Sequence, residues 1–449
     1  MTTNAAARAA DTAPRYTSYP TAPHFHAGVS AQPVVGWLAA LPAGERLSLY
    51  VHVPFCDRLC WFCACHTKQV LRYEPVAAFL ESLRAEIRMV GAKVGGRAAV
   101  SALHFGGGSP TMLRPDDFLA LMRDLRAAFA FDPAAAISVE IDPNDMDEPR
   151  LDALAEGGMT RASLGIQDFD ERVQKAINRE QSFETTRDVV EGLRARGVGS
   201  VNLDMLYGLP HQTRDSLAAT VEKVLSLRPD RIALFGYAHV PWFKKHQTMI
   251  DEAFLPDAAE RLAQALLAAG MIRAAGYAAI GIDHFALPGD SLALAAANGA
   301  LRRNFQGYTD DGCETLVGLG PSSISGFRQG YAQNVPATGD YQRRIAAGEL
   351  TVVRGIALSD DDRVRRWVIE RLMCDFSFSC AEARARFGDA ATAILAQAAL
   401  LARPGADADL VRDGDRYVVP DVQRPLVRLV AARFDGYLAA GTARHSAAV

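Results

Sequence analysis

Apolar runs of five to seven residues alternate with segments of helical periodicity through much of the chain. The runs lie at 47–53, 100–105, 137–141, 162–166, 201–206 and 232–237. Between them, apolar side chains recur every three or four residues, as at Val76, Phe79, Leu80 and Leu83, which is typical of a helix with one buried face. This alternation predicts a parallel sheet with right-handed crossovers. A further apolar run at 277–282 is a candidate for extending the sheet.

Six strand–helix units, rather than the eight of a closed barrel, predict an α/β fold built on an incomplete (β/α)6 barrel of the TIM type. Such a barrel has a lateral opening wide enough for a large planar substrate. We expect residues 1–46 to form an N-terminal arm and lead-in, in which the prolines at 14 and 20 favour an extended path. Residues 47–340 are expected to form the barrel with its extension.

The pattern changes near residue 340, so we expect 341–449 to form a smaller, mostly α-helical, winged-helix-like domain. Acidic residues at 360–362 predict a helix start there. The segment 410–419 predicts a hairpin that turns at Asp413-Gly414. Winged-helix domains often bind DNA, but the formal net charge of −4 gives no basic field for it. We therefore expect a packing or lid role and no nucleic-acid partner.

Polar residues follow the predicted strands repeatedly. Ligands of parallel α/β folds bind at the carboxyl ends of the strands, so these residues are expected to form one site. They are a glycine loop ending in Ser109 after the second strand, Glu140 and Asp142 at the third, Gln167 and Asp168 at the fourth, and Asp204 in the fifth.

Four of the seven cysteines lie within ten residues after the first predicted strand, at positions 56, 60, 63 and 65. Thiolates are natural ligands of iron–sulfur centres. Zinc sites usually combine two C-x2-C pairs or add histidines, whereas this C-x3-C-x2-C stands alone. Three ligands leave one iron of a four-iron cluster open to a substrate. Cys65 exceeds this requirement, and its role stays open.

The cysteine count and the distribution of apolar residues restrict the cellular compartment in which the protein is expected. An odd number of cysteines, mostly clustered, is not a disulfide framework, and the start of the chain lacks the apolar segment of a secretory signal. No apolar run approaches the roughly 18 residues of a membrane span. We therefore expect a cytoplasmic protein, and no partner signature stands out, so we expect a monomer.

Together these segments resemble the oxygen-independent coproporphyrinogen III oxidases (dehydrogenases), a family of the radical S-adenosylmethionine (SAM) superfamily. The likeness runs from about residue 14 to 438. The matching stretches are 14–21, 50–65, 104–111, 138–143, 163–169, 178–181, 202–210, 236–241, 281–285, 303–308 and 318–325. The serine at 109 replaces a common threonine, and Asn144 stands where a familiar relative has arginine.

The resemblance implies a 4Fe–4S cluster, two bound SAM molecules and a role for each matching residue. Cys56, Cys60 and Cys63 would bind the cluster, and Glu140 and Arg179 would join them as catalytic residues. The first SAM would contact Tyr50, Gly107, Glu140 and Ile324. The second would contact Phe62, Gly108, Ser109, Gln167, Arg179, Asp204 and Ala238.

The implied reaction is oxidative decarboxylation of two propionate side chains of coproporphyrinogen III to vinyl groups, which gives protoporphyrinogen IX in haem biosynthesis. A 5′-deoxyadenosyl radical would remove hydrogen from the propionate carbon next to the ring. The implied partners are coproporphyrinogen III, an electron donor such as a flavodoxin-type protein and an electron acceptor that the resemblance does not specify.

Three alternatives stay open. A haem-binding chaperone of the same superfamily would have an aromatic residue in place of Cys65 and would lack the 14–21 arm. An anaerobic haem-modifying methyltransferase, or an enzyme that opens haem, is disfavoured by the 304–308 stretch. A structural zinc protein would contain zinc without sulfide.

Overall fold

The computed structural model describes residues 11–403 and 408–438. Within them, one long curved sheet dominates, with strand order β16-β15-β14-β13-β1-β4-β5-β6-β7-β8-β10-β9. Neighbouring strands run parallel from β13 through β8. The six predicted strands are all present in this stretch. They are β1 (Glu45–Val53), β4 (Ala98–Gly107), β5 (Ala130–Ile141), β6 (Arg161–Gln167), β7 (Ser200–Tyr207) and β8 (Arg231–Gly236).

Antiparallel strands extend both edges of this parallel region. The apolar run at 277–282 does join the sheet, through an intervening strand. The added strands are β9 (Ala278–Ile280) and β10 (His284–Ala286) at one edge, and β14 (Ile324–Gly326), β15 (Gly330–Asn334) and β16 (Val352–Ala357) at the other, beyond the parallel strand β13 (Thr315–Leu319). The edge strands β9 and β16 do not pair with each other, so the barrel stays open.

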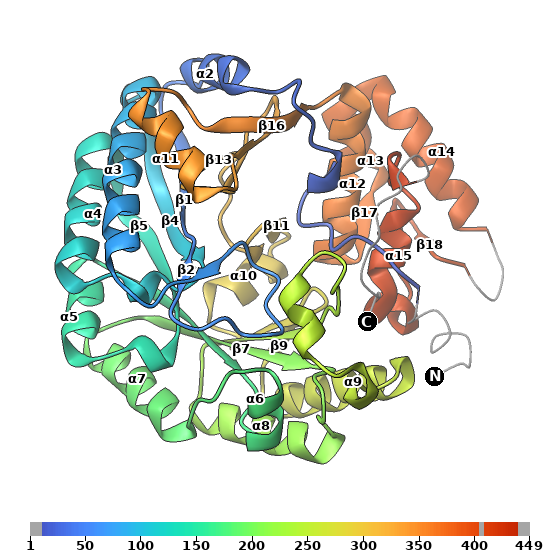
Figure 1. Cartoon of the computed structure of the whole chain (residues 1–449). Coiled ribbons are helices and arrows are strands. Elements are labelled where there is room, and N and C mark those ends of the chain that lie inside the picture. Colours follow the sequence, from blue (N-terminus) through green and yellow to red (C-terminus); the bar gives the residue numbers. More distant parts are fainter. Residues whose placement is uncertain (1–10, 404–407, 439–449) are drawn as a thin grey trace.

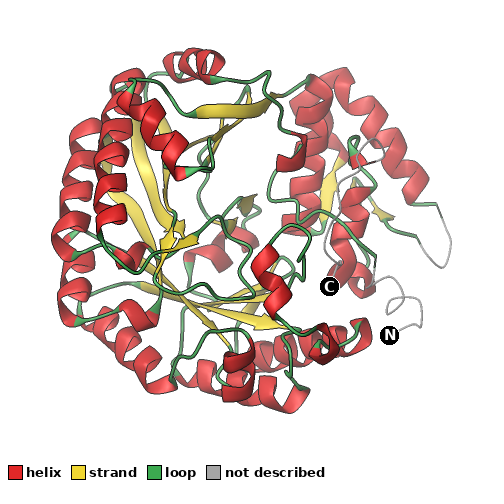
Figure 2. Ribbon diagram, in the orientation of Figure 1, coloured by secondary structure: helices red, strands yellow, loops and turns green. Residues whose placement is uncertain are grey.

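Helices cover the outer face of the sheet (Figures 1 and 2). Alternate residues of β1, Leu47, Leu49 and Val51, are fully buried in the core beneath them. The helices of this layer are α2 (Ala31–Ala39), α3 (Glu74–Val94), α4 (Pro115–Ala128), α5 (Glu148–Glu156), α6 (Glu171–Ala176), α7 (Phe183–Ala195), α8 (Arg214–Ser226), α9 (Ala258–Ala274) and α11 (Thr338–Ala346). The short helix α10 (Ser291–Ala297) lies inside this ring and packs against β9 and β10 (Figure 1).

Short elements complete the barrel. The strand β2 (Phe55–Cys56) pairs with β3 (Lys68–Gln69), and β11 (Arg302–Asn304) pairs with β12 (Gly307–Thr309). The 3-10 helices of the described chain are η1 (Ala22–His24), η2 (Pro110–Met112), η3 (Pro143–Asp145), η4 (Lys245–Met249), η5 (Glu252–Phe254), η6 (Gly388–Ala390) and η7 (Asp421–Leu426). No helix among the described residues is long and apolar enough to cross a membrane.

A second hydrophobic core lies at the open side of the barrel (Figure 1). Its helices are α12 (Asp360–Asp375), α13 (Cys380–Phe387), α14 (Ala391–Leu401) and α15 (Val427–Ala432), and its sheet has the order β17 (Ser377–Ser379), β19 (Arg416–Val418), β18 (Val411–Asp413). The helix start is as predicted, because Ser359 and Asp362 form a capping box. The hairpin is also present, but its turn is Gly414-Asp415, one residue later than predicted, since Asp413 pairs with Arg416.

Residues 341–357, which the sequence assigned to the C-terminal domain, contribute β16 and part of α11 to the barrel layer. Tyr341 and Val352 are buried in the barrel core, whereas the second core begins at Val364 apart from two arm tyrosines. We therefore propose a domain division after β16 instead of at 340/341.

The segment 13–20 runs between the barrel and the second core. Tyr16 and Tyr19 are buried in that core, and the Tyr19 hydroxyl accepts from the Gly436 N–H at 2.9 Å. On the barrel side, Arg15 Nη2 donates to the Gly236 carbonyl at 3.1 Å. The arm therefore joins the two parts of the molecule.

Candidate active site

The cysteine loop leaves the barrel at β2 and returns in β3, which runs parallel to β2. Cys56 is the last residue of β2. Cys60 is buried, Cys56 and Cys63 are half-buried, and Cys65 is exposed. The Cys65 thiol faces the same group, because it forms a side-chain hydrogen bond with the Cys63 thiol.

Two distant segments hold this loop in place. On one side, Trp61 N–H donates to the Ile177 carbonyl at 2.9 Å, and the Asn178 amide donates to the Leu59 carbonyl at 3.0 Å. Because the loop backbone is tied to other elements through such bonds, the thiols are positioned before any ligand binds.

On the other side, η4 and the residue before it donate to three successive regions of the loop. Lys244 Nζ lies 2.8 Å from the Cys65 carbonyl, and His246 Nε2 donates to the Cys63 carbonyl at 2.7 Å. The Gln247 amide donates to the Phe62 carbonyl at 2.9 Å. None of these contacts was predicted, because they join positions some 180 residues apart.

The three thiols do not lie close enough together for one small ion. Among the described residues, the group whose ligand atoms all lie within 4.8 Å of one another is Asp57, Asp142 and Asp145, and it includes no thiol. Ligands of a single tetrahedral zinc at about 2.3 Å would lie closer than this. The wider spacing favours a multi-metal cluster.

Burial also controls the thiol chemistry. It raises the pKa of Cys56 to about 12 and raises that of Cys60 as well. Hydrogen bonds from Cys65, including one from its N–H at 3.3 Å, outweigh burial and lower the pKa of Cys63. A bound metal ion deprotonates a coordinating thiol outright, so these buried thiols are suited to a metal rather than to free nucleophilic chemistry.

Polar side chains on the inner face of β1, β4 and β5 form a connected row. Tyr50 is in register with His104, and their rings stack with centroids 5.9 Å apart. His104 Nε2 lies 3.0 Å from Glu140 Oε1, and Gly107 N–H donates to Glu140 Oε2 at 3.2 Å. Although burial raises the pKa of Glu140, the His104 hydrogen bond and charge and the Gly107 N–H lower it overall. Glu140 therefore presents an ionised carboxylate, 41% exposed.

The glycine loop fits closely against β1 and the cysteine loop. A Cβ at Gly107, whose φ is +112°, would lie 2.5 Å from the His52 ring. A Cβ at Gly108 would lie 2.3 Å from the Phe55 carbonyl oxygen. The next residue, Ser109, is 5% exposed and its hydroxyl donates to Asp145 Oδ2 at 2.5 Å. Any ligand contact at Ser109 therefore falls to its backbone.

Arg179 occupies the space between the cysteine loop and the ends of β5 and β6. Its Nη1 lies 2.5 Å from Asp142 Oδ2 and 3.8 Å from Cys60 Sγ, and its Nη2 donates to the Gly165 carbonyl at 2.7 Å. Its Nε is buried and has no hydrogen-bond partner. Arg179 thus places a fixed cation beside one thiol.

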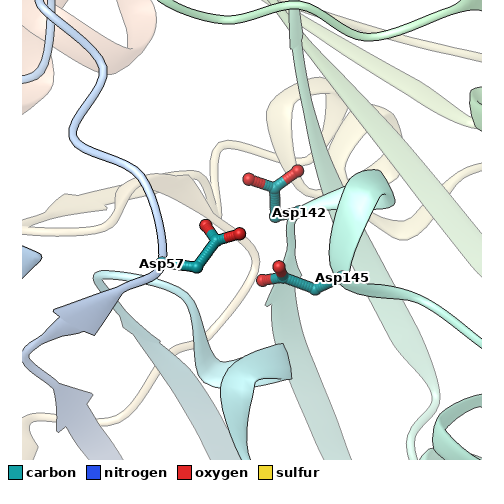
Figure 3. A group of neighbouring side chains, drawn as sticks. All are labelled: Asp57, Asp142 and Asp145. Atoms are coloured by element: carbon teal, nitrogen blue, oxygen red, sulfur yellow. The ribbon is translucent and has the colours of Figure 1, made fainter. Parts of the chain in front are cut away.

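Asp142 faces Asp57 and Asp145 in a group of three carboxylates (Figure 3). Burial, together with the charge of Asp142, raises the pKa of Asp145 to about 6. Arg179 balances Asp142, and Ser109 donates to Asp145. The group therefore anchors Arg179 and the glycine loop.

A second polar network lies on β6 and β7. Asp204 accepts from the Ser163 hydroxyl at 3.0 Å and from the Asn202 amide at 2.7 Å. Burial nevertheless raises the pKa of Asp204 to about 6. Asn202 Oδ1 is buried without a partner. Nearby, Gln167 has a φ of +67° at a break in the β6–β7 register, which turns its side chain toward the space above Gly165.

The last three predicted contacts lie at the margins of this site. Phe62 packs against the apolar cluster that contains Tyr237. Ala238 follows that tyrosine and its carbonyl accepts from Gln247 at 3.1 Å. Ile324 lies on β14, and its backbone would contact a Cβ added at Gly318, the register partner of Tyr50. Asp168, predicted from its place at the end of β6, is instead fully buried, and its carboxylate accepts from the Gln212 amide at 2.6 Å and the Thr220 hydroxyl at 2.9 Å, so it supports the loop before α8.

Two inner-face histidines were missed at the sequence level. His52 Nε2 donates to the His66 carbonyl at 2.8 Å, and His104 positions Glu140. The sequence pattern that could have revealed them is the alternation of polar and apolar residues in β1 and β4, where each histidine is next to an apolar core residue, Val51 or Phe105.

Comparison with known proteins identifies relatives over the whole barrel and beyond. A model of the radical SAM superfamily matches residues 50–224. The oxygen-independent coproporphyrinogen III oxidase of Bradyrhizobium diazoefficiens is 49% identical over 436 residues, which cover 97% of this chain and 97% of that protein. The protein of the same name from Paracoccus denitrificans is 50% identical over 437 residues, covering 97% and 96%.

A solved structure matches as well. It is the coproporphyrinogen III oxidase from Escherichia coli, a radical SAM enzyme, with a TM-score of 0.90 and 38% sequence identity. The match covers 94% of this chain and 98% of that one, which confirms the α/β fold class. The chain belongs to the oxygen-independent coproporphyrinogen III oxidase family of the radical SAM superfamily.

Proposed function

We propose that this protein catalyses the oxygen-independent oxidative decarboxylation of two propionate side chains of coproporphyrinogen III, giving the vinyl groups of protoporphyrinogen IX in haem biosynthesis. The observation that carries the proposal is the approach of Arg179 Nη1 to Cys60 Sγ, 3.8 Å, within a three-thiol loop above a polar barrel interior. Relatives that bear this enzyme's name over the full chain length support it.

The donor set fits the 4Fe–4S cluster and SAM that the family implies. Cys56, Cys60 and Cys63 would hold the cluster and leave one iron free, and their wide spacing suits a cluster better than a single ion. When bound, the cluster supplies the electron that converts SAM to methionine and a 5′-deoxyadenosyl radical. The buried Arg179 Nε and Asn202 Oδ1, which have no partner in the protein, offer a donor and an acceptor to bound groups.

The protein's own part is placement and exclusion of water. We assign Tyr50, Gly107, Glu140 and Ile324 to the first SAM. The ionised Glu140 carboxylate suits an ammonium or ribose hydroxyl, and Gly107 permits close backbone approach.

We further propose a second SAM beside the first. Arg179 supplies a fixed cation for its carboxylate and Asp204 an acceptor for its hydroxyl groups. Ser109 contributes its backbone, because its hydroxyl is engaged with Asp145. The remaining contacts in this assignment are Phe62, Gly108, Gln167 and Ala238.

An external protein is proposed as the electron donor, of the acidic flavodoxin type. Trp242 and Phe243 are 52% and 72% exposed, and the adjoining Lys244 contacts the cysteine loop at Cys65. Exposed aromatic rings beside lysines suit a transient complex with an acidic partner. We propose the cytoplasm as its compartment, because its seven cysteines are free thiols. We also propose that the protein is a monomer.

The test is an anaerobic assay of protein reconstituted with iron and sulfide. The mixture contains SAM, a reductant, cell extract as a source of electron acceptor, and coproporphyrinogen III. Chromatography should show protoporphyrin and 5′-deoxyadenosine formed together. The same protein without SAM is the control. Formation of 5′-deoxyadenosine with no decarboxylated porphyrin would contradict the proposal.

A further inference from the structure

A cavity of about 550 Å³ lies at the carboxyl ends of β7 and β8, where the barrel meets the arm and the second core. Tyr207 and Gly236 end these strands and line the cavity, and α15 and Phe376 contribute from the C-terminal side. The lining is rich in guanidinium groups. They belong to Arg15, Arg261, Arg273, Arg303, Arg424 and Arg428, against the carboxylates of Asp283 and Asp421.

Several of these cations donate to neutral backbone carbonyls. Arg15 donates to the Gly236 carbonyl at 3.1 Å, Arg261 to the Tyr237 carbonyl at 2.8 Å, and Arg428 to the Pro14 carbonyl at 3.1 Å. Asp421 forms an ion pair with Arg424 at 2.8 Å. This leaves Asp283 as the other carboxylate lining the cavity, so the lining carries an excess of positive charge.

Arg303 is the cation of this group that points most clearly to a ligand. Its side chain is 5% exposed, and its Nε and Nη1 are buried without a hydrogen-bond partner. Asp283 Oδ1 lies 3.9 Å from Nη1, too far for a hydrogen bond. A buried guanidinium with unsatisfied donors is costly unless an anion completes it.

The neighbouring charges reinforce this imbalance. Burial, followed by the charges of Arg15 and Arg303, lowers the pKa of Arg428 to about 9. Burial also lowers the pKa of Arg15, and the charge of Arg303 contributes in the same direction. Like charges held this close are relieved by a bound polyanion.

The cavity adjoins the proposed reaction site. Phe235 lines the cavity and belongs to the same apolar cluster as Phe62 of the cysteine loop. Ala238, assigned above to the second SAM, is also a lining residue. A large ligand in the cavity can therefore extend toward the cysteine loop.

We propose that this cavity binds carboxylates of the tetrapyrrole substrate, and that Arg303, together with Arg15 and Arg428, holds propionate groups other than the one that is reacting. The inference rests on the proposed function, which supplies a substrate with four propionates. Arginine's planar fork suits bidentate recognition of carboxylates. Carboxylates at the open side of the barrel would orient the ring edge that reacts toward the cysteine loop.

The carboxylate in the methionine part of SAM could bind the same arginines as a substrate propionate. Measuring the affinity for each ligand separately distinguishes these two carboxylates. The probes are coproporphyrin III, a stable fluorescent porphyrin with the same four propionates, its uncharged tetramethyl ester, and SAM. They are titrated into the full-length reconstituted protein and into the Arg303→Gln, Arg303→Lys and Arg15→Gln variants. Arg187→Gln, an exposed arginine paired with Asp188, is the matched control.

Each glutamine variant should lower the affinity for coproporphyrin III about tenfold, because one charge-assisted contact is lost. Arg303→Lys should retain part of the affinity, since it keeps the charge without the fork. Tetramethyl ester affinity and SAM affinity should not change, and Arg187→Gln should behave as wild type. Arg15 lines the cavity from the arm and remains partly accessible to solvent, so its variant keeps the test valid if Arg303→Gln folds poorly.

Unchanged coproporphyrin III affinity in both glutamine variants would overturn the inference. So would a loss confined to SAM, which would assign the cations to the methionine carboxylate. If wild-type protein fails to decarboxylate coproporphyrinogen III while the variants still lose coproporphyrin III affinity, the carboxylate site stands and the proposed reaction alone fails.

Discussion

Arg179 and Cys60 are 119 residues apart in the chain, yet the arginine Nη1 lies 3.8 Å from the cysteine Sγ. The same nitrogen contacts Asp142 after β5, and Nη2 contacts Gly165 in β6. One buried side chain therefore connects the cysteine loop with two strand ends. A change at this residue should affect cofactor placement more than cluster assembly.

For Arg179→Gln, we expect iron and sulfide content close to wild type and a decarboxylation rate lower by about a hundredfold, since contacts of a charged group are lost. Leaving Asp142 unpaired should also cost about 3 kcal/mol of unfolding free energy. Metal analysis, the rate assay and thermal unfolding measure these effects, with Arg187→Gln as control. Normal SAM affinity together with a normal rate would contradict the assignment.

Cys60→Ser and Cys65→Ser should differ in cluster content. Cys60 is a buried thiol beside Arg179, whereas Cys65 lies outside the C-x3-C-x2-C set. Its backbone N–H, which serine retains, donates to Cys63 Sγ, and the serine hydroxyl can replace the side-chain hydrogen bond to Cys63. We expect Cys60→Ser to lose the visible absorbance and bound sulfide of the reconstituted cluster and Cys65→Ser to keep both. Loss of both signals in Cys65→Ser would make Cys65 a ligand and revise the set of three.

The binding of SAM should weaken in acid through Asp204. Burial raises the pKa of this carboxyl from 3.8 to about 6, so its charged, accepting form appears only as the pH rises through that value. Affinity for SAM should therefore fall as the pH drops from 7.5 to 5.5. Equilibrium dialysis over this range measures it.

The Asp204→Asn variant is the control for that profile. It should bind SAM more weakly at pH 7.5 and lose the acid-side decline, because the amide does not titrate. The contribution of Asp204 to folding stability has the opposite sign. A raised carboxyl pKa means that the folded state loses stability as the pH rises from the ordinary value through 6. An unaltered acid-side decline in Asp204→Asn would assign the titration to another group.

Gly108→Ala should destabilise the protein, because a Cβ there would lie 2.3 Å from the backbone oxygen of Phe55. We expect a loss of about 2 kcal/mol or more in unfolding free energy, together with a reduced yield of cluster. The matched control is Gly270→Ala in α9, where a Cβ meets nothing within 4 Å and alanine should stabilise the helix by about 0.5–1 kcal/mol. Equal melting temperatures for Gly108→Ala and wild type would show that the loop can shift.

The sequence pattern was sufficient for β1 and β4 through β8, since each is a buried apolar run between amphipathic helices. The pattern did not predict the strands β13 to β16. These strands are only three to six residues long, and glycines such as Gly318, Gly320 and Gly326 lie within or between them. β13 also pairs with β1 across a separation of more than 260 residues, as at Leu47 and Thr315. No local periodicity encodes such a pairing.

The sequence predicted the site residues at the strand ends but not the residues that support them from distant parts of the chain. Parallel strands deliver their carboxyl ends to one edge, so the placement of Glu140 and Asp204 on the same interior side of the barrel follows from topology. The support of that loop by Lys244, His246 and Gln247 depends on how a long connection folds back, which spacing does not reveal. The cation-lined cavity was missed for the same reason, since Arg15, Arg303 and Arg428 come from three separate regions.

The arm contact described above also sets an order of events during synthesis. Arg428 donates to the carbonyl of Pro14 across 414 residues of sequence. Residues 45–249 contain the cysteine loop, the strands β1 to β8 and the η4 residues that hold the loop, and they can fold while translation continues, but the cation-lined wall requires the segment near 428. A nascent chain can therefore acquire its cluster ligands well before it can capture a tetracarboxylate, which separates assembly of the reactive centre from access to its substrate.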